Sequence, residues 1–191
     1  RVICEQLTLL GYKYISQVMN ASEYGDVPQN RERIYIVAFR DNKDYANFSM
    51  PLPMELKKTL RDVIDFEKKQ DDKYYYSSKN CKFYKELKRD MKNKHTIYQW
   101  RRVYVRENKS NLVPTLTANM GTGGHNVPLI LTDDNKIRKL TPRECFRVQG
   151  FPKEFVLPEQ SNTRLYKQAG NSVVVPVIKR IADNIASAVK E

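Results

Sequence analysis

Two arginines placed two residues apart offer the clearest chemistry in this chain of 191 residues. Arg31 and Arg33 stand at the entrance to the apolar run 34–39, which predicts a strand. Side chains at positions i and i+2 of a strand point to the same side. Their guanidinium groups could therefore grip a phosphate or a base carbonyl through paired hydrogen bonds. Taken alone, the pattern favours surface salt bridges with Glu32 and Glu23 instead.

Three further segments combine polar residues, proline and glycine in unusual patterns. The first is Pro-Thr-Leu-Thr-Ala-Asn-Met-Gly at 114–121. The second is Arg-Lys-Leu-Thr-Pro-Arg-Glu-Cys-Phe-Arg-Val-Gln-Gly-Phe-Pro at 138–152, and the third is Tyr-Lys-Gln-Ala-Gly-Asn-Ser-Val-Val-Val-Pro at 166–176. In the second segment, Thr141 can cap a helix and Glu144 stands three residues later, which predicts a helix over 141–149.

Together with Val-Pro-Gln-Asn-Arg-Glu-Arg at 27–33, these segments resemble the C-terminal half of the cytosine-5 DNA methyltransferases. Segment 27–33 resembles the eighth motif of that family, 138–152 the ninth, and Gly-Asn-Ser-Val at 170–173 the tenth. The stretch between the eighth and ninth motifs corresponds to the target recognition domain of the family, whose Thr-Leu pair matches Thr115 and Leu116. The resemblance covers nearly the whole chain, and the order and spacing are more specific than any single motif.

The resemblance implies an α/β fold. We expect the C-terminal part of a Rossmann-like S-adenosylmethionine-dependent methyltransferase fold, plus a small mixed, mainly β target recognition domain. Residues 1–53 would be the C-terminal strands of the catalytic domain, and 54–137 the target recognition domain. Residues 138–191 would hold the ninth-motif helix and the C-terminal helix that returns to the catalytic domain.

The resemblance also implies covalent chemistry. Family members flip the target cytosine out of the duplex. A cysteine thiolate then attacks carbon 6, a glutamate stabilises the activated ring, and S-adenosylmethionine gives its methyl group to carbon 5. The family's Pro-Cys-Gln, Glu-Asn-Val and Phe-x-Gly-x-Gly segments are absent from this chain. We expect all three to lie before Arg1, so that this chain alone is inactive. Cys4 and Cys145 are expected to be buried structural thiols.

Roles for individual residues follow from the resemblance and from the charge pattern. Arg31 and Arg33 are expected to support catalysis by bordering the flipped base and its phosphates. The residues expected to bind DNA are Gln29, Arg101, Arg102, Arg106, Thr115, Leu116, Thr117 and Asn119. Those expected to form one wall of the S-adenosylmethionine pocket are Asn171, Ser172 and Val173. Most of that pocket would lie outside this chain, and no metal site is expected. The ninth-motif residues Arg143, Arg147 and Gln149 are expected to give structural support.

The net charge of +12 is concentrated in one central segment. Residues 79–109 hold 11 basic and 3 acidic residues, interleaved with aromatic side chains. This combination indicates a face that binds nucleic acid, although a solvated helix surface is about as good an explanation of the charge alone. A stretch without charged residues follows at 111–132, and it contains glycines. It is either a loop whose backbone approaches a ligand closely or a flexible hairpin tip. Within it His125 is a candidate DNA contact, whereas His95 is expected to be solvated.

Hydrophobic periodicity predicts the elements that position these residues. Helices are expected over 2–10, 55–66, 82–93 and 141–149, and from Val174 onward. Strands are expected over 12–20, 33–40, 103–106 and 112–118, with a loop over 41–53. The first helix begins without a capping residue, which suggests that the chain continues a larger protein.

The resemblance leads us to expect the C-terminal part of a DNA (cytosine-5-)-methyltransferase of a restriction–modification system. Its partners would be double-stranded DNA and an N-terminal catalytic half, in cis or as a separate subunit. We expect it in the bacterial cytoplasm, associated with the nucleoid and without a membrane-spanning segment. The alternatives are a non-catalytic DNA-specificity subunit of a split methyltransferase and an RNA cytosine methyltransferase. A basic binding domain with chance motifs is a more remote one.

Overall fold

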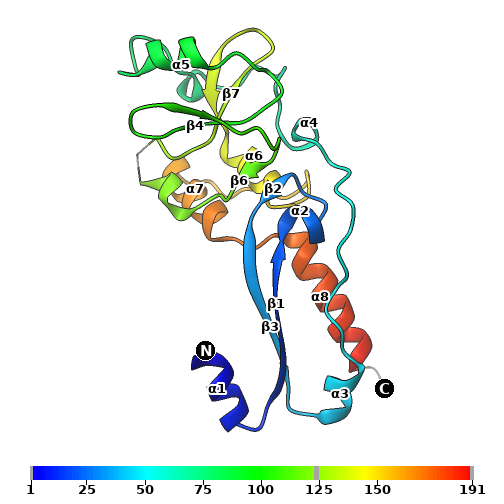
Figure 1. The fold of residues 1–191 in the computed structure, drawn as a ribbon. Coiled ribbons are helices and arrows are strands. Elements are labelled where there is room, and N and C mark those ends of the chain that lie inside the picture. The colour runs from blue at the N-terminus through cyan, green and yellow to red at the C-terminus, as the bar shows by residue number, and fades with distance from the viewer. Residues whose placement is uncertain (1, 123–124, 190–191) are drawn as a thin grey trace.

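A long two-stranded ribbon forms one end of the molecule in the computed structural model, which describes residues 2–122 and 125–189 (Figure 1). Strand β1, Lys13–Asn20, pairs antiparallel along its whole length with β3, Glu32–Phe39. Both strands are confirmed to within one residue of the predicted bounds. The run Ile-Tyr-Ile-Val-Ala-Phe in β3 is apolar on both faces, as in strands that are buried on both sides of a sheet.

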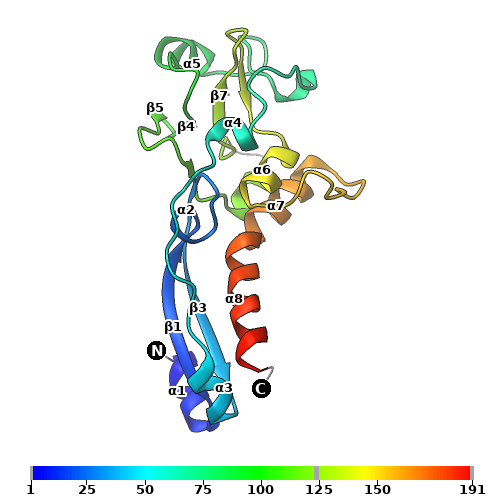
Figure 2. The same cartoon turned by 90° about the vertical axis from the view of Figure 1, so that its right-hand side faces the viewer.

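Helix α8, Val175–Ala188, covers one face of this ribbon (Figure 2). Its Val177 is buried in a core that also contains Val37 of β3. The opposite face of the ribbon is open. Val18 and Ile34 stand opposite each other in the strand register, and their side chains are 61% and 62% exposed. The ribbon therefore presents an apolar surface that no part of the described chain covers.

Helix α1, Val2–Leu9, lies beside the far end of the ribbon, close to the predicted position (Figure 1). None of its residues is buried, and Val2, Ile3 and Leu9 are each more than half exposed. The prediction that Cys4 is a buried thiol is therefore wrong, because too little of the chain packs on α1 and Cys4 is only partly covered.

A four-stranded antiparallel sheet organises the other end of the molecule, in the order β5-β4-β7-β8. Its strands are β4, Tyr98–Trp100; β5, Val105–Glu107; β7, Leu129–Leu131; and β8, Ile137–Lys139. Helix α5, Tyr84–Asp90, packs on this sheet through a core that includes Leu87, Tyr98 and Leu129. The region expected to be mainly β and to recognise the target thus has a sheet and a core of its own.

Helices α6, Pro142–Val148, and α7, Asn162–Asn171, lie between the sheet and the ribbon (Figure 1). They share a core with α4, Leu60–Val63, and with β7. The domain boundary expected between residues 137 and 138 falls inside β8, which pairs with β7. Of the helices that follow β8, α6 packs with the sheet end of the molecule and α8 packs on the ribbon.

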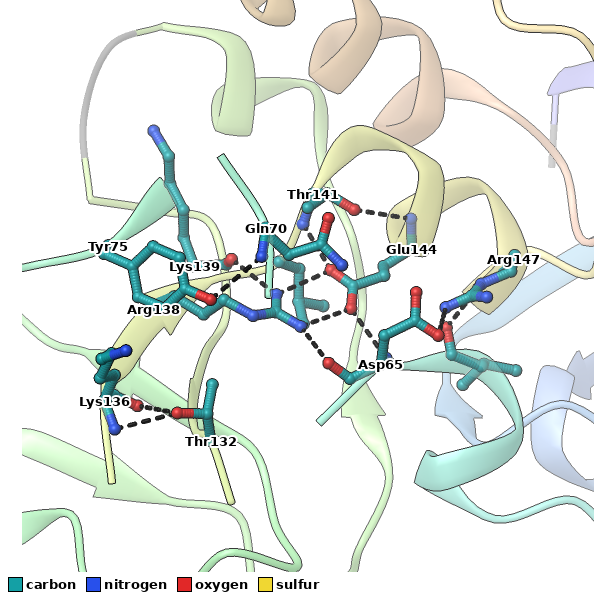
Figure 3. A network of polar contacts seen from close by, with 12 residues as sticks. Asp65, Gln70, Tyr75, Thr132, Lys136, Arg138, Lys139, Thr141, Glu144 and Arg147 are labelled. Carbon is teal, nitrogen blue, oxygen red and sulfur yellow. Dashed lines mark hydrogen bonds and ion pairs between the residues drawn. The ribbon is translucent and has the colours of Figure 1, made fainter. Parts of the chain in front are cut away.

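A buried ion pair joins β8 to the predicted helix α6 (Figure 3). Arg138 and Glu144 are almost fully buried, and their closest nitrogen and oxygen atoms are 2.7 Å apart. Glu144 also accepts a hydrogen bond from the backbone N–H of Thr141, so the predicted capping box is confirmed. Arg138 donates to the carbonyl oxygen of Asp65 at 2.7 Å, and Arg147 forms an ion pair with the Asp65 carboxylate at 2.9 Å. These contacts hold α6 against the segment that follows α4.

The remaining described elements are short: α2, Ala21–Tyr24; β2, Gln29–Asn30; α3, Asn42–Asn47; a 3-10 turn, Asp72–Tyr74; β6, Val113–Pro114; and a second 3-10 turn, Ala118–Gly121. Strands β2 and β6 pair in parallel and bring the eighth-motif segment beside the Thr-Leu segment. Gly123 and Gly124 of the neutral stretch lie outside the described residues. No described helix is long and apolar enough to cross a membrane.

Several expected elements differ from those observed. The loop expected over 41–53 contains α3, because the Asp41 carboxylate caps that helix by accepting backbone hydrogen bonds. The helix expected over 55–66 shortens to α4, and the strand expected over 112–118 shortens to β6. Helix α7 was not predicted, although Ser161 caps it and its buried residues Leu165, Tyr166 and Ala169 fall at helical spacing.

Candidate nucleic-acid interface

A polar cleft of about 430 Å³ opens between the β4–β5 hairpin and the segment that follows β6. Five of the eight residues expected to bind DNA line it: Arg101, Arg106, Thr115, Thr117 and Asn119. His125, the candidate DNA contact of the neutral stretch, lines it as well. The fold thus brings together residues that are separated by up to 24 positions in the chain, from 101 to 125. Their DNA-binding roles stay predictions.

The other three residues expected to bind DNA do not line the cleft. Arg102 is exposed at the turn of the hairpin and has a φ of 64°. The expected DNA contact of Leu116 is corrected, because its side chain is buried in the core and has no surface to offer a ligand. Gln29 is also fully buried, and its side-chain amide has no hydrogen-bond partner among the described residues.

The arginines of the hairpin differ from most other arginines of the described chain. Arg31, Arg61, Arg138 and Arg147, for example, use their guanidinium groups for internal hydrogen bonds or ion pairs. The guanidinium groups of three hairpin arginines have no such partner within the described residues: Arg101, Arg102 and Arg106. Two of these guanidinium groups line the polar cleft and that of Arg102 lies at the adjacent turn, so all three are available to bind phosphates or base edges.

An aromatic cluster supports one side of the cleft. The rings of Phe83 and Trp100 are stacked with centroids 4.0 Å apart. The His125 ring meets Phe83 edge-on at 4.4 Å, and its Nδ1 lies 3.4 Å from the hydroxyl oxygen of Tyr76. Partial burial and the nearby charge of Lys139 lower the pKa of His125 below its usual value of 6.5. The imidazole is therefore neutral at pH 7 and can both donate and accept a hydrogen bond.

The segment that carries Thr117 is fixed against α7. Gly170 of α7 lies so close to this segment that a Cβ atom at position 170 would overlap the backbone carbonyl of Thr117. Gly121 approaches α7 in the same way, and a Cβ there would overlap the carbonyl oxygen of Thr163. Two glycines thus let backbone pack on backbone below the cleft.

Arg31 and Arg33, expected to act as a pair, have different surroundings. Arg31 is only 6% exposed and donates to the carbonyl oxygens of Leu116 at 2.7 Å, Ser172 at 2.9 Å and Gly170 at 3.3 Å. Burial lowers the pKa of Arg31. Arg33 is exposed and donates to the carbonyl oxygen of the preceding residue at 2.6 Å. Among the described residues Arg33 forms no salt bridge, so the alternative explanation of the pair is not observed.

The three residues expected at the cofactor follow α7 directly or end it. The Asn171 side chain is exposed, and Val173 is half exposed. The Ser172 hydroxyl donates to the carbonyl oxygen of Ala169 at 2.8 Å. Asn171 and Ser172 border a shallow hollow of about 540 Å³ together with Arg164 and Lys167. Among the described residues no group of His, Cys, Asp and Glu has the arrangement of a metal site.

Two of the three cysteines, Cys81 and Cys145, have buried thiols. Cys145 is fully buried in α6, and burial raises the pKa of its thiol well above the usual value. Cys81 is also buried, with its pKa raised for the same reason. A thiol with a raised pKa is protonated at neutral pH and is a poor nucleophile.

A family model for C-5 cytosine-specific DNA methylases matches residues 1–187. This chain belongs to that family. The type II methyltransferase M.Bsp6I of Bacillus sp. (strain RFL6) is 60% identical over 185 residues, which cover 97% of this methylase chain and 58% of that protein. The type II methyltransferase M.MspI of Moraxella sp is 35% identical over 191 residues, which cover 100% of this chain and 42% of that protein. The methylase chain thus spans about half the length of the curated relatives it matches.

Solved structures confirm the α/β, Rossmann-like methyltransferase fold expected for this methylase chain. The Entamoeba histolytica methyltransferase EhMeth superposes with a TM-score of 0.69 at 16% identity, covering 100% of this chain and 58% of that one. The S. pombe Dnmt2 methyltransferase gives a TM-score of 0.67 at 16% identity, and the superposition covers 98% of this chain and 63% of that one. At these identities the likeness concerns the fold alone.

Proposed function

We propose that this chain forms the target-recognition part of a DNA (cytosine-5-)-methyltransferase, together with the strands and last helix that complete its catalytic domain. The observation that carries the proposal is the polar cleft beside three arginines without a partner among the described residues. Guanidinium groups bind both phosphates and base edges. The relatives are type II methyltransferases, which supports duplex DNA as the ligand and a restriction–modification system as the setting.

We propose further that an N-terminal half, in cis or as a separate subunit, supplies the covalent chemistry. It would carry the cysteine that attacks carbon 6 of the flipped cytosine and the glutamate that stabilises the ring. The open face of the ribbon, with Val18 and Ile34, supports this division. A strand that is apolar on both faces is stabilised when a second layer covers the face that α8 leaves open.

The residues after α7 fit one wall of an S-adenosylmethionine pocket. The exposed amide of Asn171 has no side-chain partner in the described chain and is free to bond a ligand, and the half-exposed Val173 can pack on an apolar part of it. Ser172 holds this wall in place, because its hydroxyl and its carbonyl oxygen are both engaged within the chain. S-adenosylmethionine, when bound, supplies a methyl group on a positively charged sulfonium. We propose that most of its pocket lies in the N-terminal half.

Within this chain we assign different tasks to the two arginines of the eighth motif. Arg33 is exposed at the start of β3, and we propose that it borders the flipped base and its phosphate. Arg31 does not line the cleft. Its task is to hold the Leu116 backbone and the segment after α7 in fixed positions.

A salt titration of DNA binding tests the recognition role. Affinity for duplex DNA should fall as salt rises, with a logarithmic slope of about −0.9 for each phosphate contacted. Replacing Arg101, Arg102 and Arg106 together by Gln should weaken binding and flatten that slope. The matched control replaces three exposed lysines that do not line the cleft: Lys68, Lys69 and Lys153. Equal effects of both triple variants, or no binding at low salt, would contradict the role of the cleft.

A methyl-transfer assay tests the proposed division of labour. The isolated chain, incubated with duplex DNA and labelled S-adenosylmethionine, should transfer no methyl group, and the N-terminal half should restore transfer. Turnover by the chain alone would contradict the proposal that the nucleophile lies elsewhere.

A further inference from the structure

We propose that the β4–β5 hairpin carries the base-reading pair of the cleft, in which Arg106 contacts a guanine and Gln99 contacts the adjacent base pair. This inference rests on the proposed function, because it requires that the cleft binds duplex DNA. It adds the residues that determine sequence specificity and the base that one of them reads.

The register of the hairpin places the two side chains together. Gln99 of β4 is paired directly with Arg106 of β5, so both side chains project from the same face of the β4–β5 hairpin. Both line the cleft. Neither side chain has a hydrogen bond or an ion pair with another described residue. Side chains paired across strands start about 5 Å apart, and successive base pairs are about 3.4 Å apart. The pair can therefore reach two neighbouring base pairs.

The opposite face of the hairpin is anchored, so that the reading pair is held in position. Tyr98 is fully buried, and its hydroxyl accepts hydrogen bonds from the backbone N–H groups of Lys92 and Asn93. Trp100 and Val105 pack on the same core. A bidentate hydrogen bond needs a backbone that is held in place, because the bond is lost when the guanidinium plane tilts away from the plane of its two acceptors.

The chemistry of the pair favours bases over phosphates. An arginine fork matches the O6 and N7 acceptors of guanine in the major groove, and a glutamine amide matches adenine N6 and N7. A neutral amide neutralises no phosphate charge, so Gln99 adds nothing to the charge-dependent part of DNA binding. Phosphates can instead be contacted at the hairpin turn, where Arg101 and Arg102 directly precede Val103, which is 81% exposed. A two-stranded ribbon also fits the width of the major groove, about 12 Å.

Selection from a randomised duplex pool by the full-length protein tests this inference. Bound duplexes are sequenced for the unchanged protein, for Arg106→Gln and for Gln99→Ala. Arg106→Gln should reduce the preference for guanine over the other bases at one position by about tenfold or more, and should shift it toward adenine. Gln99→Ala should reduce the preference at the neighbouring position only. The matched control, Arg102→Gln, removes the same charge from the hairpin turn and should lower affinity for all sequences alike.

Each other outcome identifies which proposal fails. If the unchanged protein binds and enriches a site but Arg106→Gln behaves like Arg102→Gln, Arg106 is a phosphate contact and the inference is overturned while DNA recognition stands. If the unchanged protein enriches no sequence and binds no duplex, the proposed function fails and the inference fails with it. Thermal unfolding of each variant checks that these mainly surface changes leave the fold intact.

Discussion

The guanidinium group of Arg31 donates a 2.7 Å hydrogen bond to the backbone carbonyl oxygen of Leu116, a residue 85 positions further along the chain. The same group bonds the carbonyl oxygens of Gly170 and Ser172. One side chain thus joins the segment before β3, the segment beside the cleft and the segment expected to border the cofactor.

Removing this guanidinium should destabilise the protein more than removing its exposed neighbour. Arg31→Ala leaves up to three carbonyl oxygens without a donor, and we expect a loss of about 3 kcal/mol or more in the free energy of unfolding. Arg33→Ala should change that free energy by less than about 0.5 kcal/mol and should lower turnover of the full-length enzyme about ten- to hundredfold. Urea denaturation and methyl-transfer rates on both variants separate the two roles. A stability defect without an activity defect in Arg33→Ala would exclude its role at the flipped base.

Gly170→Ala should disturb both stability and the cleft. The added Cβ would overlap the Thr117 carbonyl, so α7 and the segment beside the cleft must move apart. Overpacking of this kind costs about 1–3 kcal/mol or more, and Thr117 and Asn119 would shift with the backbone. Denaturation and DNA affinity should therefore change together. Ala186→Ser on the exposed side of α8 is the matched control and should leave both unchanged. A fully stable Gly170→Ala variant would show that the two segments separate at little cost.

Breaking the ion pair of Figure 3 should be among the most damaging single changes. Glu144→Gln leaves the buried charge of Arg138 without its counter-charge and weakens the cap at Thr141. A single buried charge left unpaired costs about 3–5 kcal/mol. Glu154→Gln, at an exposed site, is the control. Replacing both partners by apolar residues should recover part of the loss, and no recovery would mean that the hydrogen bonds to backbone matter more than the charges.

The neutral state of His125 should make stability depend on pH. Its pKa is lower in the folded chain than the usual 6.5, so the unfolded chain binds a proton more readily. The stability gained from the neutral imidazole is complete above about pH 6.5 and is lost as the pH falls through the folded pKa. His125→Gln should flatten this part of the melting-temperature profile. His95→Gln, at a position that does not line the cleft, is the control variant.

Elements with strong local signals could be predicted from the sequence. The apolar run of β3 and the capping box at Thr141 each depend on neighbouring residues, and both are confirmed. Helix α7 was missed although it has a local signal, because Ser161 can cap it and Leu165, Tyr166 and Ala169 fall on one face. Its packing against α6 and the Ala118–Gly121 turn could not be foreseen from the sequence. The contacts of Arg31 were equally hidden, since its acceptors are backbone atoms that any residue provides.

The sequence identified most of the cleft residues that we expected to bind DNA, but not which side chains point into the cleft or which strand positions are paired. Thr115 and Thr117 line the cleft while Leu116 is buried between them, and the alternation of an extended segment was the available signal for excluding Leu116. Gln99 was missed because only the hairpin turn determines that it stands opposite Arg106. A turn with a positive φ at Arg102 has no reliable signature in the sequence.

The three hydrogen bonds that Arg31 donates to backbone oxygens also affect how the sequence of such a protein can change during evolution. The acceptors are main-chain oxygens, so a mutation at 117 or 171 changes a side chain without removing any of the three hydrogen bonds that Arg31 donates. The loop beside the cleft can therefore exchange its side chains over evolutionary time while its backbone stays in place. New target sequences become accessible by substitution in the loop, provided that the guanidinium holding it is inherited unchanged.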